Sequence, residues 1–150
     1  MTPRRLAAGL TLLLGTAPVP APAGEPGPRL LAEPPDRAVH HHTNRITLDH
    51  RALTTGWADL HQCHTNMDAL GRTQIVFREG RIRNIEVVST TNIDKARVAG
   101  PSVQLDGVRK GAEICLRAET RNLRRPREGT LTVRSGPFMR RLFDSYFPLH

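Results

Sequence analysis

Short stretches in which apolar and polar residues alternate recur along the chain. In residues 112–118 the even-numbered positions are Ala, Ile, Leu and Ala, whereas the odd-numbered positions are Glu, Cys and Arg. Because successive side chains of a strand point to opposite faces, this pattern predicts a strand with one buried face. Residues 130–134 repeat the alternation over a shorter length.

Two further stretches, 73–77 and 81–88, flank Glu79-Gly80 and predict a hairpin in which Gly80 takes a positive φ. A short strand is expected after the Gly100-Pro101 turn, and weaker strand patterns lie earlier, at 45–48 and 57–63. About seven short strands at this spacing predict a mainly β protein, an antiparallel β-sandwich.

The C-terminal end has a different periodicity. Pro137 suits the first position of a helix, and Pro148 would end it. Between them the large apolar residues fall on one helical stripe: Phe138, Met139, Leu142, Phe143, Tyr146 and Phe147. The sequence therefore predicts one C-terminal amphipathic helix over residues 137–147.

The N-terminal end resembles a secretory signal peptide over residues 1–23. Arg4 and Arg5 precede a nine-residue apolar run, and Ala21-Pro22-Ala23 fits the rule of small residues at the cleavage site. The alternative, a buried N-terminal helix, is disfavoured by the prolines that follow the run. Cleavage after Ala23 predicts a periplasmic or secreted protein.

Residues 24–38 are rich in proline and predict an extended linker, followed by a single domain over residues 39–150. The chain of 150 residues has a net charge of +8, which becomes +6 once Arg4 and Arg5 leave with the signal peptide. No apolar run reaches the roughly 18 residues that a membrane-spanning helix needs. Export, rather than charge, excludes nucleic acid from the expected partners.

Cys63 and Cys115 are the only cysteines. An oxidising compartment predicts that they form one disulfide, worth about 4 kcal/mol in the chain-entropy view because it closes a long loop. A redox or metal-binding pair would normally sit closer together in the sequence. Because Cys115 lies on the polar side of its strand, the bridge is expected on the outside of a sheet.

Six of the seven histidines lie between residues 40 and 64. Imidazole binds Zn, Cu and Ni, so His40 and His42 on one strand face, with His61 or His64 from a neighbour, form a hypothetical metal site. Against this, no cysteine or carboxylate completes a known ligand spacing, and His61 and His64 would face opposite ways on a strand. We therefore expect no cofactor, and keep metal binding as the alternative function.

No catalytic motif is present, which favours a non-enzymatic protein. A basic stretch beside the predicted C-terminal helix instead suggests a binding surface for an unknown envelope protein or an anionic membrane surface. The residues expected on that surface are Phe138, Arg140, Arg141 and Phe143.

Four segments resemble an uncharacterised family of exported proteobacterial proteins: His40-His41-His42, residues 71–77 (GRTQIVF), residues 100–105 (GPSVQL) and residues 136–141 (GPFMRR). The resemblance implies a bacterial envelope setting and no particular activity. The leading hypothesis is an exported binding or assembly module, and the alternative is a periplasmic Cu, Zn or Ni protein.

Overall fold

The computed structural model describes residues 31–33, 35–124, 130–142 and 145–150. The signal peptide predicted over 1–23 and the first part of the predicted linker lie outside the described residues. The described elements, in chain order, are β1 (His41–Thr47), α1 (His50–Thr55), β2 (Ala58–Met67), β3 (Leu70–Val76), β4 (Ile82–Ala99), β5 (Ser102–Thr120), β6 (Leu123–Arg124), β7 (Thr132–Val133), β8 (Arg140–Leu142) and β9 (Ser145–Phe147).

The central element is β5, which pairs with three other strands. On one edge, β5 pairs antiparallel with β4 along most of its length. On the other edge, the first part of β5 pairs with β3 and the last part pairs with β2, and β1 pairs with the outer edge of β2. The mainly antiparallel β class is therefore confirmed. The sandwich of short strands is not confirmed, because the described residues form one five-stranded sheet with two long strands and two small pairs, β6–β7 and β8–β9.

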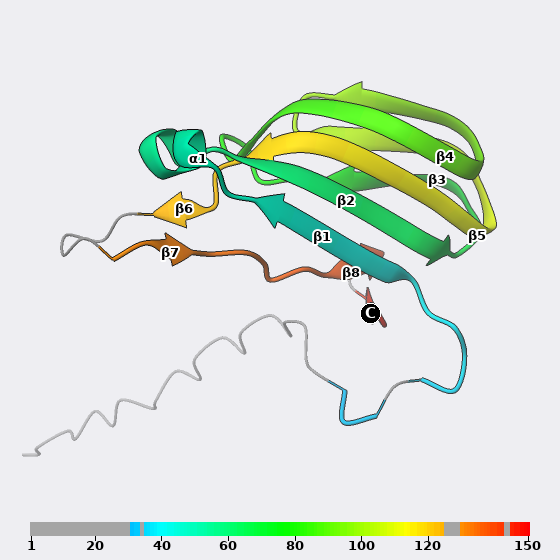
Figure 1. Ribbon diagram of the computed structural model, residues 1–150. Helices are drawn as coiled ribbons and strands as arrows, with labels where there is room; N and C mark the ends of the chain where they lie inside the picture. Colours follow the sequence, from blue (N-terminus) through cyan, green and yellow to red (C-terminus); the bar gives the residue numbers. More distant parts are fainter. Residues whose placement is uncertain (1–30, 34, 125–129, 143–144) are drawn as a thin grey trace, which may run out of the picture.

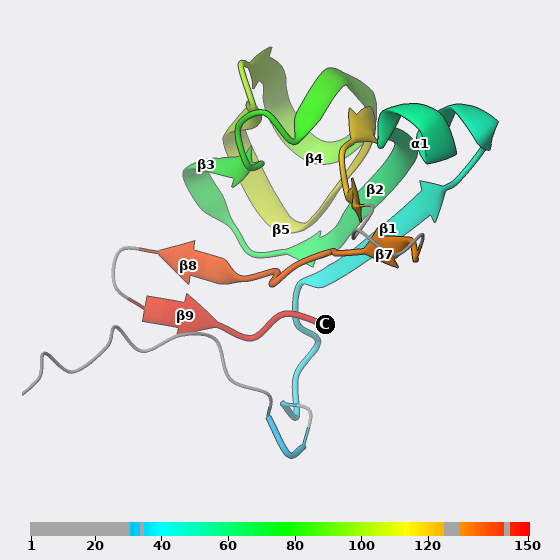
Figure 2. The same cartoon turned by 90° about the vertical axis from the view of Figure 1, so that its left-hand side faces the viewer.

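The five-stranded sheet coils into a trough (Figure 2). The 19 residues of β5 would extend about 60 Å if the strand were straight. However, the short link between β3 and β4 binds next to both ends of β5. Before β5, the Phe77 N–H donates to the Pro101 carbonyl at 2.8 Å, and after β5, the Arg121 N–H donates to the Arg81 carbonyl at 3.0 Å. Residues 77–81 span at most about 18 Å, so the two ends of β5 must curl toward each other.

This coiling also explains why the expected hairpin between 73–77 and 81–88 does not form. Gly80 has the predicted positive φ, 70°, and both strands exist. They do not pair with each other, because β5 lies between them and takes both as partners.

The bend occurs where β5 contains extra residues. Between the pairs Thr91↔Glu113 and Ile93↔Val108, β4 advances by two residues while β5 advances by five. Gly107 and Gly111 lie at this bulge with φ of 62° and 72°, a conformation that costs glycine little. The Asp94 side chain packs directly against Gly107, where a Cβ would collide with it.

The hydrophobic core lies on the inner face of the trough and draws mainly on β5. Alternate residues of β5 supply most of it, as the sequence pattern predicted. The buried members are Met67, Ile75, Val103, Leu105, Val108, Ala112, Ile114 and Leu116.

The helix predicted over 137–147 is wrong for the described residues, which form the short hairpin β8–β9. The final residues bind to β1: the His42 N–H donates to the His150 carbonyl at 2.6 Å, and the His150 N–H donates to the His40 carbonyl at 2.9 Å. β8 and β9 run in opposite directions, which two parts of one continuous helix cannot do. Pairing between β8 and β9 thus replaces the hydrogen bonds of the expected helix.

Candidate functional site

Three of the histidines suggested by the sequence meet on the inner face of the sheet. His42 in β1 lies directly opposite His64 in β2, and His40 immediately precedes β1. The imidazole rings of His42 and His64 are stacked, with centroids 4.5 Å apart and an interplanar angle of 5°. His61 is exposed on the outer face, because residues three apart on a strand point in opposite directions.

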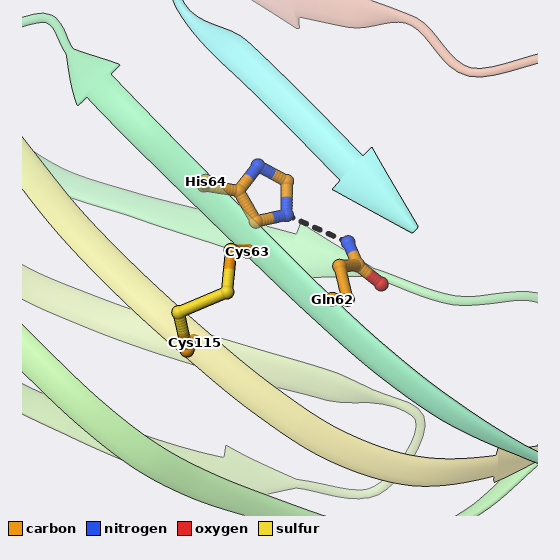
Figure 3. The surroundings of a disulfide bond; sticks show 4 residues. All are labelled: Gln62, Cys63, His64 and Cys115. Atoms are coloured by element: carbon orange, nitrogen blue, oxygen red, sulfur yellow. Dashed lines mark hydrogen bonds between the residues drawn. A yellow bond between two sulfur atoms is a disulfide. The ribbon is translucent and has the colours of Figure 1, made fainter. Parts of the chain in front are cut away.

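The buried His64 is held by two hydrogen bonds. Its Nε2 lies 2.6 Å from Gln62 Nε2, and its Nδ1 lies 2.8 Å from His40 Nε2 (Figure 3 shows the bond to Gln62). With the amide in this orientation Gln62 donates, so His64 accepts at Nε2 and carries its proton on Nδ1. That proton is donated to His40, which leaves the remaining proton of neutral His40 on Nδ1.

Burial makes these imidazoles hard to protonate. It lowers the pKa of His64 to about 3, with smaller contributions from His42 and His40. Burial, together with the nearby Arg140 guanidinium, lowers the pKa of His40 to about 4. The pKa of His42 is also lowered, again chiefly by burial. All three rings are therefore neutral at neutral pH.

The stacked arrangement does not direct the three imidazoles at one metal ion. In the part of the chain that the structure describes, only His61, Cys63 and Cys115 bring three ligand atoms within 4.8 Å of one another. Both sulfurs of that group are bonded to each other and are not thiolates, the form that binds metal. Sequence reasoning did not identify Gln62, which orients His64. The one signal for it is its position two residues before His64, which puts both side chains on the same face of β2.

The predicted disulfide is present on the outer face. Cys63 and Cys115 are opposite each other in the register of β2 and β5, and their Cα atoms are 4.2 Å apart. Figure 3 shows the bridge between the two strands, beside the Gln62–His64 pair. The bridge fixes the register of β2 against β5 one residue before His64. It is compatible with an extracellular or periplasmic location.

The C-terminal segment runs alongside β1 (Figures 1 and 2) and packs on the histidines. The Phe138 ring, half exposed, meets the His42 ring edge-on at 4.9 Å between centroids. Arg140 pairs with Asp68 and lies over the Phe147 ring at 5.2 Å. Of the predicted binding residues, Phe138 and Arg140 thus pack against this region and Arg141 is exposed, while Phe143 is outside the described residues.

Between the C-terminal segment and the inner face of the sheet lies a cavity of about 800 Å³. His40, His42 and His64 lie along one part of it, and Phe138 and Arg140 border the same part from the C-terminal segment. Arg141 also lines the cavity. Its apolar wall comes from strands and C-terminal residues far apart in the sequence: Ile46, Leu60, Met67, Leu70, Ile75, Phe77, Met139, Phe147 and Leu149. The two groups of residues that the sequence suggested separately therefore border one cavity.

In comparisons with protein-family models, curated proteins and solved structures, nothing matched this chain. Among the residues described here, no helix has the length and apolar character needed to cross a membrane.

Proposed function

We propose that this protein is an exported, non-enzymatic binding module that holds a small molecule in the cavity between the inner face of the sheet and the C-terminal segment. The observation that carries the proposal is the cavity itself. Its volume of about 800 Å³ falls within the range of roughly 300–1,000 Å³ that is usual for small-molecule sites.

The composition of the wall supports the same conclusion. Ligand sites are mostly apolar with a few placed polar groups, and the wall of this cavity combines apolar side chains with the hydrogen-bonded pair His40 and His64. Because both rings are neutral, the pair carries no buried charge, and the N–H that His40 has left at Nδ1 is the hydrogen-bonding group not used by His64 or Gln62. Export is supported by the residue pattern of 1–23 and by the disulfide.

The experiment uses the full-length protein and N-phenylnaphthylamine, a neutral dye whose fluorescence rises in apolar surroundings. We expect saturable binding of one dye per chain. Asn44→Trp, which puts a large ring into the cavity wall from β1, should abolish it. Arg45→Trp is the matched control, since the same ring then points out from the exposed neighbouring position.

Binding that survives Asn44→Trp while the variant remains folded by circular dichroism would overturn the proposal. So would the absence of saturable binding to the unmodified protein.

Metal binding by the same histidines is the second candidate. The observation in its favour is that His40, His42 and His64 are neutral, the form of imidazole that binds metal. It requires the stacked rings to separate and the His40–His64 hydrogen bond to break. Equilibrium dialysis with Cu, Zn and Ni tests it, and affinity weaker than micromolar that is unchanged by His64→Gln would exclude it.

A further inference from the structure

One end of the cavity, which we call the arginine end, is lined by five arginines. They come from the β3–β4 link, the end of β5 and the β6–β7 pair: Arg78, Arg81, Arg121, Arg124 and Arg134. Backbone hydrogen bonds hold these segments together, from the Arg121 N–H to the Arg81 carbonyl and from the Arg134 N–H to the Asn122 carbonyl, each at 3.0 Å. The grouping is therefore fixed by the fold and does not depend on flexible side chains meeting.

The positive charge of the arginine end is not balanced. Several arginines outside the cavity are ion-paired: Arg51 and Arg83 both bind Glu119, and Arg72 binds Asp106. Within the described ranges, none of the five arginines forms an ion pair with a carboxylate. The only acidic side chain among the described residues of the wall is Asp68, which is already paired with Arg140.

Away from the arginine end the wall is mostly apolar. Met67 is buried there, and Leu70 and Phe147 are half-buried. The cavity thus combines a cationic end with an apolar body. Such a division matches a ligand that carries its negative charge at one end of a hydrocarbon chain, because buried methylenes gain from leaving water while guanidinium groups pair with carboxylate or phosphate.

We propose that the ligand is an amphiphile with an acyl chain and a carboxylate or phosphate head group, with the head group at the arginine end and the chain along the apolar body. This inference rests on the proposed binding function and specifies its ligand. The neutral histidines would then border the chain and not the head group, since a cationic imidazole is not available there at neutral pH.

Displacement of N-phenylnaphthylamine from the full-length protein tests the proposal. The competitors are dodecanoate and dodecyl phosphate, both below their micelle-forming concentrations, with dodecanol as the uncharged equivalent. Acetate and inorganic phosphate supply the head groups alone. We expect one or both charged amphiphiles to bind at least ~10-fold more tightly than dodecanol, and the short anions not to displace the dye. The two charged amphiphiles also distinguish a carboxylate from a phosphate head group.

A charge-removing variant locates the head group. It replaces three arginines of the arginine end whose side chains form no hydrogen bond or ion pair within the described part of the chain, namely Arg78→Gln, Arg124→Gln and Arg134→Gln. Its control removes the same charge from exposed positions outside the cavity, namely Arg45→Gln, Arg97→Gln and Arg117→Gln. We expect the preference for the charged amphiphile over dodecanol to fall at least ~10-fold in the first variant and to be unchanged in the control.

The outcomes separate the two proposals. If the dye does not bind the unmodified protein, the binding function itself fails. If the dye binds but dodecanol competes as well as the charged amphiphiles, or both triple variants behave alike, the cavity binds a ligand without an anionic head group. If acetate or phosphate displaces the dye as well as the long-chain anions do, the proposal that the ligand has an acyl chain is wrong.

Discussion

His40 and His64 share a buried hydrogen bond, with 2.8 Å between His40 Nε2 and His64 Nδ1, although 24 residues separate them in the sequence. The bond joins the segment that enters β1 to the middle of β2. It also places two imidazoles with strongly lowered pKa values on the wall of the cavity. The state of this pair therefore affects both the stability of the fold and the site.

Acidification is expected to destabilise the protein through this pair. In the unfolded chain both rings accept protons near pH 6.5, but in the folded protein only near pH 3 to 4. Between these limits the unfolded state binds more protons, so stability falls as the pH falls. His42 and Arg140, which also face the pair, oppose its protonation, whereas Asp68 favours it. The thermal unfolding midpoint should decrease from pH 7 to pH 4.5.

Other groups also titrate in that range, so the measurement compares variants. His64→Gln keeps hydrogen-bonding groups but does not titrate, and should reduce the loss in midpoint between pH 7 and pH 4.5 by several degrees. His61→Gln, on the exposed face of the same strand, should leave the loss unchanged. Equal losses in the two variants would mean that the buried pair does not control the acid response.

Removal of the disulfide should cost a large part of the stability. The Cys63→Ser, Cys115→Ser variant frees a loop with a sequence separation of 52, which corresponds to about 4 kcal/mol. Guanidinium unfolding followed by circular dichroism measures the loss. A reductant should lower the stability of the unmodified protein and have no effect on the variant, and a variant as stable as the parent would contradict the structural role.

Gly107→Ala should destabilise the bend of β5. The added Cβ would meet the Asp94 side chain, and φ of 62° is unfavourable for alanine. We expect a loss of about 1–3 kcal/mol in the free energy of unfolding. Gly71→Ala in β3 is the control, because nothing lies within 4 Å of its Cβ position and its φ is not in the left-handed region. A tolerated Gly107→Ala would show that the bend does not need this glycine.

Arg140→Gln should loosen the C-terminal segment over the cavity. The Arg140 side chain, which pairs with Asp68, is only 19% exposed, whereas the Arg72 side chain, which pairs with Asp106, is 84% exposed. The Arg140–Asp68 pair is therefore better shielded from water. Hydrogen exchange of the C-terminal peptide should become several-fold faster in Arg140→Gln, which corresponds to about 1 kcal/mol. Arg72→Gln should leave that peptide unchanged, and equal exchange in both variants would argue against an anchoring role.

Local pattern was a good guide to which residues form strands and which face each side chain takes. Alternation in residues 112–118 anticipated the buried face of β5, and it placed Cys115 on the outer face, where the disulfide lies. The polar second half of β4 was missed, because a strand that is exposed along most of its length has no buried face to mark it.

The sequence by itself therefore determined the β class and the separation of His61 from His64, since both depend on the two-residue period of a strand. It also determined the disulfide, since Cys63 and Cys115 are the only cysteines of the chain. Only the tertiary structure decided which strands pair, because β5 reaches both β3 and β4 by bending at its glycines. It also decided the C-terminal hairpin, in which the pairing of β8 with β9 replaces the hydrogen bonds of the expected helix, and His150 binds to β1 beyond it. The cavity follows from these long-range choices, and no local pattern contains them.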